Sequence, residues 1–255
     1  MTKQNRSPST YGFFYLLLAA VFFFGCVQPL KVPIETVRYD AEERRGPRYL
    51  FVFLPGKGDP VSVFAKKGFI EAVRERKLPV DMISVNAHLG YYGNGTVFTR
   101  LKEDVIDPAK AEGYDQVWMI GNSLGGYGSL FYACEFPEEL TGVVLLGPFL
   151  GEKPIIQEIM LAGGVQQWDP GPMSSQSRAT WEKLLWLRFK KCMNEKGFLT
   201  KVYMGYGRSD RFSFGQDFLA SLLLPEHVIV VDGGHDWSTW QRLWKRFLDS
   251  IFVGQ

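Results

Sequence analysis

Short apolar runs alternate along the chain with longer stretches in which apolar residues recur every three or four positions. An apolar run bounded by Gly, Pro or polar residues predicts a strand buried on both faces, as in a parallel sheet. The longer stretches have the spacing of amphipathic helices. Strands are predicted at 49–54, 80–87, 116–121, 142–147, 202–207 and 228–232. The alternation predicts an α/β domain with a mainly parallel sheet flanked by helices.

Helices are predicted between or after these strands, at 61–76, 97–112, 124–135 and 238–252. We expect Pro108 to kink or divide the second of them, because proline lacks the N–H that continues a helix.

The connection 151–200 is, at about 50 residues, far longer than an ordinary loop. It contains predicted helices at 154–162 and 180–194. Three tryptophans fall within it: Trp168, Trp181 and Trp186. We interpret this connection as a small helical lid insertion over the carboxyl edge of the sheet. The alternative is an insertion whose tryptophans only pack it onto the body.

The first 26 residues have the organisation of an export signal. Lys3 and Arg6 precede an uncharged run from Phe13 to Cys26. A membrane-spanning helix needs about 20 apolar residues, so this run is short for a span. An apolar core followed by a small residue is typical of a signal peptide. We therefore predict an exported protein, with residues 1–25 as the signal and 26–47 as a polar tether.

The pair Gly25-Cys26 at the end of this run resembles the lipobox of bacterial lipoproteins. In that family the cysteine receives diacylglycerol and becomes the mature N-terminus. The resemblance implies lipid attachment at Cys26 and a place in the cell envelope, on the periplasmic or extracellular face. Phe23 departs from the Leu, Val or Ile usual at its position. A simply cleaved signal and an uncleaved membrane anchor are the alternatives.

Composition limits what the remaining residues, 48–255, can be. The chain has 255 residues, of which 46% are hydrophobic, and a formal charge of +2, which excludes a disordered chain. The two surplus basic residues, Lys3 and Arg6, both lie in the signal. A neutral domain gives no electrostatic footprint for nucleic acid, so we expect no nucleic-acid partner. The oligomeric state is not predicted.

The three cysteines are too few for a disulfide scaffold, and no CxxC or HxxxH spacing indicates a metal site. Export places Cys134 and Cys192 in an oxidising compartment. Sequence alone does not show whether the two are close enough to pair. Because Cys134 lies on a predicted buried helix face, we favour a free core thiol.

A candidate nucleophile lies between the third predicted strand and the helix after it. The segment Gly121-Asn122-Ser123-Leu124-Gly125 has the form G-x-S-x-G. Glycines at this spacing permit a sharp turn that raises Ser123 above the sheet, because a Cβ there would collide with the neighbouring backbone. The strand–turn–helix context predicts that Ser123 is a catalytic nucleophile.

A serine hydroxyl needs a base, and the chain has three histidines. His235 follows the last strand, at the edge where all carboxyl ends of a parallel sheet meet, so it is the predicted base. His227 precedes that strand and belongs to the opposite edge. His88 follows the second strand; a surface-loop position is favoured over a place in the pocket.

The base needs an acid that holds its tautomer. Asp210 follows the fifth strand and is the predicted acid. Asp232 and Asp236 are rivals because they are close to His235 in sequence, but neighbours on a short loop rarely reach the far ring nitrogen. A helix N-cap is the alternative role for Asp210.

Two backbone amides are predicted to form an oxyanion hole. Leu124 follows the nucleophile at a helix N-terminus. The second donor is expected from the loop after the first strand, with Lys57 favoured and Gly56 and Gly58 as adjacent possibilities. The signatures of phosphate-binding and dinucleotide-binding loops are absent there.

The order Ser123, Asp210, His235 on alternating strands and helices resembles the α/β-hydrolase superfamily, over about residues 48–253. The resemblance implies the α/β-hydrolase fold, a lid at 151–200 and at least one antiparallel strand within 34–39. It implies acyl transfer to water from a small-molecule acyl ester, with no metal or organic cofactor. The usual His-Gly pair of the oxyanion loop is replaced by Pro55-Gly56-Lys57.

The leading hypothesis is therefore a serine-dependent carboxylic-ester hydrolase that works through an acyl-enzyme. The alternatives are a serine acyltransferase or amide-type hydrolase with the same triad, and a non-catalytic binding protein of the envelope. The natural substrate and its acyl length are not encoded in any motif.

Overall fold

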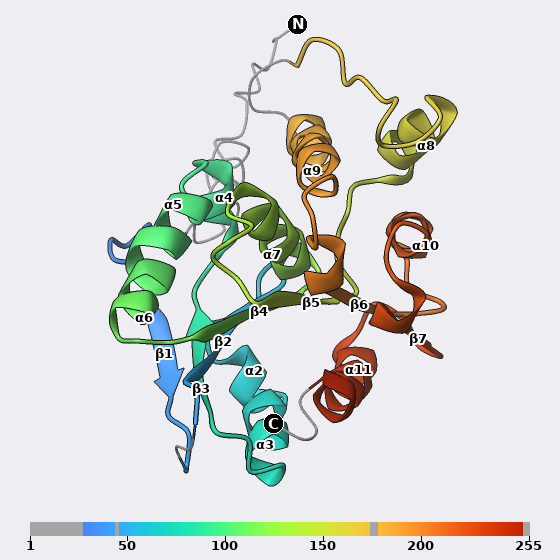
Figure 1. The fold of residues 1–255 in the computed structure, drawn as a ribbon. Helices are drawn as coiled ribbons and strands as arrows, with labels where there is room; N and C mark the ends of the chain where they lie inside the picture. Colours follow the sequence, from blue (N-terminus) through green and yellow to red (C-terminus); the bar gives the residue numbers. More distant parts are fainter. Residues whose placement is uncertain (1–27, 44–45, 174–177, 252–255) are drawn as a thin grey trace, which may run out of the picture.

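A seven-stranded sheet organises the computed structural model, which describes residues 28–43, 46–173 and 178–251 (Figure 1). The strand order is β1-β3-β2-β4-β5-β6-β7. Only β1 is antiparallel to its neighbour, β3; the other pairs are parallel. The strands are β1 (Thr36–Tyr39), β2 (Tyr49–Leu54), β3 (Val80–Val85), β4 (Gln116–Asn122), β5 (Gly142–Leu146), β6 (Val202–Gly207) and β7 (Val228–Val231).

Helices cover both faces of this sheet (Figure 1). One face carries α2 (Val63–Lys66), α3 (Phe69–Glu75) and α11 (Trp237–Ile251). The other face carries α4 (Leu89–Gly93), α5 (Val97–Leu101), α6 (Asp107–Ala111), α7 (Leu124–Glu135), α8 (Lys153–Leu161), α9 (Arg178–Cys192) and α10 (Ser213–Ala220). Single turns of 3₁₀ helix at Leu199–Lys201 and Pro225–His227 precede β6 and β7.

Strand β2 shows why its apolar run is continuous. Its side chains alternate between the two faces, as the period of a strand requires. Leu50, Val52 and Leu54 join the core under α7. Phe51 and Phe53 join the core under α11, where Phe53 packs edge-on against Trp244 at 5.7 Å. Both faces are dry, so both sets of positions must be apolar.

The predicted strands are confirmed, and the edge strand expected within 34–39 is β1, antiparallel to β3. The predicted helix 61–76 is two helices, α2 and α3, separated at Gly68, whose φ is +74°. The predicted helix 97–112 continues from α5 to α6 through a π-helical turn, Lys102–Ile106. Pro108 is the second residue of α6, directly after this π-helical turn, so the regular α-helical pattern is interrupted next to the proline.

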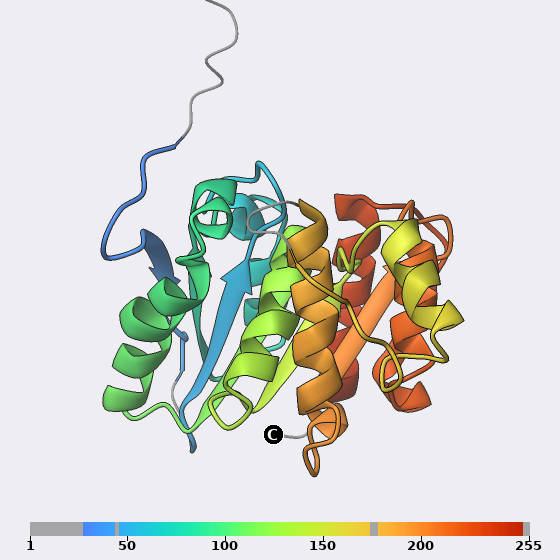
Figure 2. The ribbon, with the colours of Figure 1, turned by 90° about the horizontal axis from the view of Figure 1, so that it is seen from above.

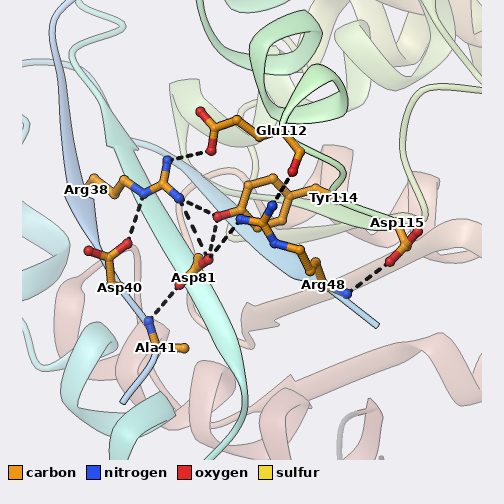
Figure 3. Close-up of polar contacts among 8 residues, drawn as sticks. All are labelled: Arg38, Asp40, Ala41, Arg48, Asp81, Glu112, Tyr114 and Asp115. Carbon is orange, nitrogen blue, oxygen red and sulfur yellow. Dashed lines mark hydrogen bonds and ion pairs between the residues drawn. The ribbon is translucent and has the colours of Figure 1, made fainter. Parts of the chain in front are cut away.

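A buried carboxylate holds the edge strand at the amino end of the sheet (Figure 3). Asp81 of β3 accepts hydrogen bonds from the Tyr114 hydroxyl and from the Ala41 amide. Arg38 of β1 donates to the Tyr114 hydroxyl at 2.6 Å, and the Arg48 guanidinium lies 4.1 Å from the centre of the Tyr114 ring. Burial and the bond to Asp81 raise the pKa of Tyr114 to about 12, so the phenol remains a donor.

The predicted insertion consists chiefly of α8 and α9, and α9 lies along α7 (Figure 2). Trp168 and Trp186 are buried. The indole N–H of Trp168 donates to Glu158 Oε1, and that of Trp186 donates to the Leu150 carbonyl. For these two tryptophans the packing alternative is confirmed. Trp181 differs, because it lines the cavity described below.

The expectation of a free thiol at Cys134 is wrong. A disulfide joins Cys134 of α7 to Cys192 of α9, with 5.1 Å between their Cα atoms. The sequence places the two cysteines in separate predicted helices, and only the packing of α9 along α7 brings them together.

In the part of the chain that the structure describes, no helix has the length and apolar character needed to cross a membrane. The predicted signal at 1–25 and the predicted lipid site at Cys26 lie outside these residues.

Replacing both Cys134 and Cys192 by alanine is expected to lower the free energy of unfolding by about 2–4 kcal/mol, because the disulfide closes a long loop in the unfolded chain. Urea unfolding followed by circular dichroism measures this loss. Dithiothreitol should destabilise the wild type by a similar amount and leave the double variant unchanged. Equal unfolding midpoints for wild type and variant would contradict the cross-link.

Candidate active site

Ser123 occupies a sharp turn between β4 and α7. Its φ of 50° and ψ of −114° are unusual for a residue with a Cβ, a strain of about 1–3 kcal/mol. Three backbone hydrogen bonds hold the turn. The Ser123 amide donates to the Leu146 carbonyl, and the Ser123 carbonyl accepts from the amides of Tyr127 and Phe149. The strained residue is therefore fixed by β5, α7 and the loop after β5.

The glycines of the motif are required by contact between backbones. A Cβ on Gly125 would lie 1.9 Å from the carbonyl oxygen of Leu54, the last residue of β2. A Cβ on Gly121 would lie 2.2 Å from the Gly125 carbonyl oxygen. No side chain fits at either position, so α7 starts directly against β4 and β2.

The predicted nucleophile, base and acid form one hydrogen-bonded chain. His235 Nε2 lies 2.9 Å from Ser123 Oγ. His235 Nδ1 lies 2.8 Å and 3.0 Å from the two carboxylate oxygens of Asp210. The Asp210 side chain is fully buried, and its Oδ1 also accepts from the Phe212 amide at 2.8 Å. A carboxylate at Nδ1 places the ring proton there and leaves Nε2 free to accept a proton from Ser123.

The rival carboxylates have other positions. Asp236 caps α11 by accepting from the Ser238 hydroxyl and from the Thr239 amide. These hydrogen bonds hold the pKa of Asp236 at about 2, so it is ionised at neutral pH. Asp232 is exposed beside Arg208.

The other two histidines lie away from Ser123. His88 is the N-cap of α4 and accepts from the Gly90 amide, and burial lowers the pKa of its ring. His227 stacks on Tyr203 before β7, at the opposite edge of the sheet, as predicted.

The candidate oxyanion loop follows β2 and lies against Ser123. Of its three candidate donors, Gly56 is already engaged, because its amide donates to Asn122 Oδ1 at 3.1 Å. Lys57 lines the same cavity as Ser123 and Leu124. Leu124 begins α7, and the N–H groups of a first helical turn have no acceptor within the helix.

The role of Asn122 was not foreseen. It is the variable residue before the serine in G-x-S-x-G, and its side chain ties the oxyanion loop to the turn. The position of Asn122 inside the motif could have drawn attention to it. Its bond to Gly56, which lies 66 residues earlier in the chain, could not be predicted from the sequence.

A cavity of about 760 Å³ opens at Ser123. Its walls are mainly apolar and aromatic, and three charged side chains line it as well. The lining residues are Lys57, Leu89, Ser123, Leu124, Tyr127, Phe149, Glu152, Trp181, Arg211 and Phe212. The space suits a small organic ester, with the nucleophile in its wall.

Among the described residues, no group of three or more His, Cys, Asp or Glu side chains converges in the manner of a metal site. The Ser123 hydroxyl reaches the cavity wall, and the His235 imidazole with its carboxylate partner Asp210 lies behind it. A hydroxyl, an imidazole and a carboxylate in this order are the groups that acyl-transfer chemistry requires.

Gly125→Ala is expected to lower the free energy of unfolding by about 3 kcal/mol or more, because the new methyl group would overlap the Leu54 carbonyl. Gly93→Ala in α4 is the matched control, since nothing lies within 4 Å of a Cβ there. That substitution should change stability by less than about 1 kcal/mol. Urea unfolding compares the two, and equal stabilities would contradict the close approach.

A family model described as the alpha/beta hydrolase fold matches residues 109–171, which include β4, Ser123, α7 and β5. A 2-hydroxy-6-oxo-6-phenylhexa-2,4-dienoate hydrolase from Burkholderia cepacia is 41% identical over 54 residues, 21% of this chain. That match spans only 18% of the length of the Burkholderia enzyme.

Two solved structures extend the similarity over most of the chain. The fluorophosphonate-binding serine hydrolase F of Staphylococcus aureus has a TM-score of 0.58 at 16% identity, covering 83% of this chain and 86% of that one. A ferulic acid esterase has a TM-score of 0.56 at 17% identity, covering 80% and 84%. With the sheet order and the strand–turn–helix at Ser123, these similarities identify the chain as a protein of the α/β-hydrolase fold.

Proposed function

We propose that the protein is a serine-dependent carboxylic-ester hydrolase. One observation carries the proposal: Ser123, His235 and Asp210 form a continuous hydrogen-bonded chain at the wall of a cavity large enough for a small ester. Each of the three comes from a different strand end, so their meeting is not a consequence of sequence neighbourhood.

In the proposed reaction, Ser123 Oγ attacks the ester carbonyl while His235 Nε2 takes the serine proton. Asp210 holds the ring and stabilises the imidazolium that forms. The amides of Leu124 and Lys57 donate to the oxyanion of the tetrahedral intermediate. His235 then protonates the leaving alcohol as the C–O bond breaks, which leaves an acyl group on Ser123. Water, activated by His235, hydrolyses that acyl-enzyme.

The comparisons support this class of chemistry without fixing the substrate. One structural neighbour is a ferulic acid esterase, and another is a serine hydrolase that binds fluorophosphonate. Both proteins are less than 20% identical to this chain, so their substrates do not indicate the acyl and alcohol groups of its ester.

We further propose that the protein is exported and attached to the membrane through a lipid on Cys26. The sequence at 13–26 supports export. The disulfide between Cys134 and Cys192 agrees with it, because structural disulfides persist in oxidising compartments and are rare in the cytosol.

A fluorophosphonate probe is expected to label the wild type and to leave Ser123→Ala unlabelled, because the probe reacts with an activated serine hydroxyl. Hydrolysis of 4-nitrophenyl acetate and butyrate should be lost in the same variant. Ser129→Ala is the control, since Ser129 is buried within α7 and bonds to the Gly125 carbonyl. Labelling of Ser123→Ala at the wild-type level would refute the nucleophile. The same esters are also incubated with an added alcohol. Formation of the new alkyl ester faster than the free acid would identify the protein as an acyltransferase.

Asp210→Asn is expected to lower kcat by about 10⁴-fold, because an amide no longer favours the productive tautomer of His235. Asp236→Asn is the matched control on the same edge. It should lower stability by less than about 1 kcal/mol, because asparagine also caps helices well and only the charge at the N-terminus of α11 is lost, and it should leave kcat within a few-fold. Steady-state kinetics and urea unfolding separate the two effects. A larger loss of kcat in Asp236→Asn than in Asp210→Asn would show that Asp236, and not Asp210, is the acid of the triad.

Cys26→Ser is expected to abolish metabolic labelling by palmitate and to release the protein from the membrane fraction. Unchanged labelling would contradict lipid attachment at Cys26.

A further inference from the structure

We propose that the cavity selects acyl esters that carry an anionic group, a carboxylate or a phosphate, and that Lys57 and Arg211 at its rim recognise that group. The inference rests on the proposed ester hydrolysis at Ser123 and names the substrate class for the same site.

Lys57 stands on one side of the nucleophile. Its neighbour Gly56 approaches Ser123 so closely that a Cβ on Gly56 would lie 3.4 Å from the Ser123 Cβ. The Lys57 side chain is exposed and lines the cavity. The ammonium group therefore extends into solvent at the rim beside the oxyanion loop, where long basic side chains commonly keep their charge in water.

Arg211 also lines the cavity and directly follows the acid Asp210. Its guanidinium lies 4.8 Å from the centre of the Phe212 ring. Phe212 in turn packs edge-on against His235, with 4.9 Å between ring centres. This stacking holds the cation on the aromatic wall next to the base, within the residues that line the cavity. The cavity that contains Ser123 thus has two positive charges in its wall, one beside the nucleophile and one beside the base.

Both cations are open to an incoming ligand. Many basic side chains of the described chain are paired with carboxylates, as Arg76 is with Asp249 and Arg100 with Asp104. Neither Lys57 nor Arg211 has a carboxylate partner among the described residues. Glu152 is the one acidic side chain that lines the cavity among the residues that the structure describes, and it has an interaction of its own. A substrate anion would therefore meet cations without displacing a resident carboxylate.

The remaining walls of the cavity are aromatic, so we expect a ligand with an apolar portion in addition to its anionic group. Tyr127, Phe149, Trp181 and Phe212 provide aromatic walls around Ser123. Phe149 and Phe212 pack edge-on at 5.1 Å, and the Tyr127 hydroxyl donates to the Trp181 carbonyl. An apolar acyl or aryl portion fits against these rings, and an anionic group on either side of the ester reaches the rim.

The test uses paired esters that differ in one charge. On the acyl side, 4-nitrophenyl hemiglutarate is compared with its methyl ester. On the alcohol side, 4-acetoxybenzoate is compared with methyl 4-acetoxybenzoate. A phosphate arm, 4-acetoxyphenyl phosphate, distinguishes phosphate from carboxylate. In at least one arm the wild type should favour the anionic ester in kcat/KM by about five- to tenfold, the scale of two partly exposed ion pairs. Sodium chloride at about 0.5 M should reduce that preference.

Arg211→Gln and Lys57→Met should each lower the preference, expressed as the ratio of kcat/KM for the charged and neutral esters, by about threefold. The double variant should abolish it, and so should Arg211→Glu, in which the new carboxylate repels the substrate anion while Lys57 still attracts it. Arg208→Gln is the matched control: it removes the same charge from the same loop, but Arg208 is exposed beside Asp232 and does not line the cavity. Its ratio should equal that of the wild type.

Three outcomes are distinguishable. Loss of the preference in the rim variants and its retention in Arg208→Gln supports the inference. Equal rates for charged and neutral esters in a wild type whose activity depends on Ser123 overturn the inference and leave the ester hydrolase intact. Activity that persists in Ser123→Ala, or no hydrolysis of any of these esters, overturns the proposed function and this inference with it.

Discussion

The close approach of α7 to β2 is the constraint on which the rest of the site depends. The backbone of Gly125 meets the last carbonyl of β2, so the helix begins at the strand ends with no side chain between them. This contact raises Ser123 above the sheet and brings the loop after β2 beside it. The Asn122 side chain then fixes the amide of Gly56, which leaves Lys57 as the next residue facing the cavity. One backbone contact thus positions both Ser123 and the loop beside it.

Parallel strands provide the rest of the arrangement. Because β6 and β7 run in the direction of β4, Asp210 and His235 emerge at the same edge as Ser123. The carboxylate of Asp210 is buried and takes a hydrogen bond from the Phe212 amide as well as from the imidazole. One short loop therefore carries the proposed acid, the ring that packs on His235 and one of the two cations of the cavity.

The fold and the core of the site were readable because they depend on short patterns. Six strands, the turn at Ser123 and the edge that Asp210 and His235 share follow from apolar runs, glycine spacing and the direction of parallel strands. The disulfide, the helices α4 and α10 and the aromatic wall were not readable. Helix α4 has the sequence LGYYG, which shows no amphipathic spacing, and the disulfide depends on how the insertion packs. Contacts between distant segments leave no periodic signal in the chain.

Helix α9 of the insertion is tied to α7 near both of its ends. Near the start of α7, the Tyr127 hydroxyl donates to the Trp181 carbonyl of α9, and near its end Cys134 is bonded to Cys192. A displacement of α9 away from α7 would therefore have to break one of these two ties. Because Tyr127 and Trp181 both line the cavity, the tie between them also limits how far the cavity can widen beside Ser123.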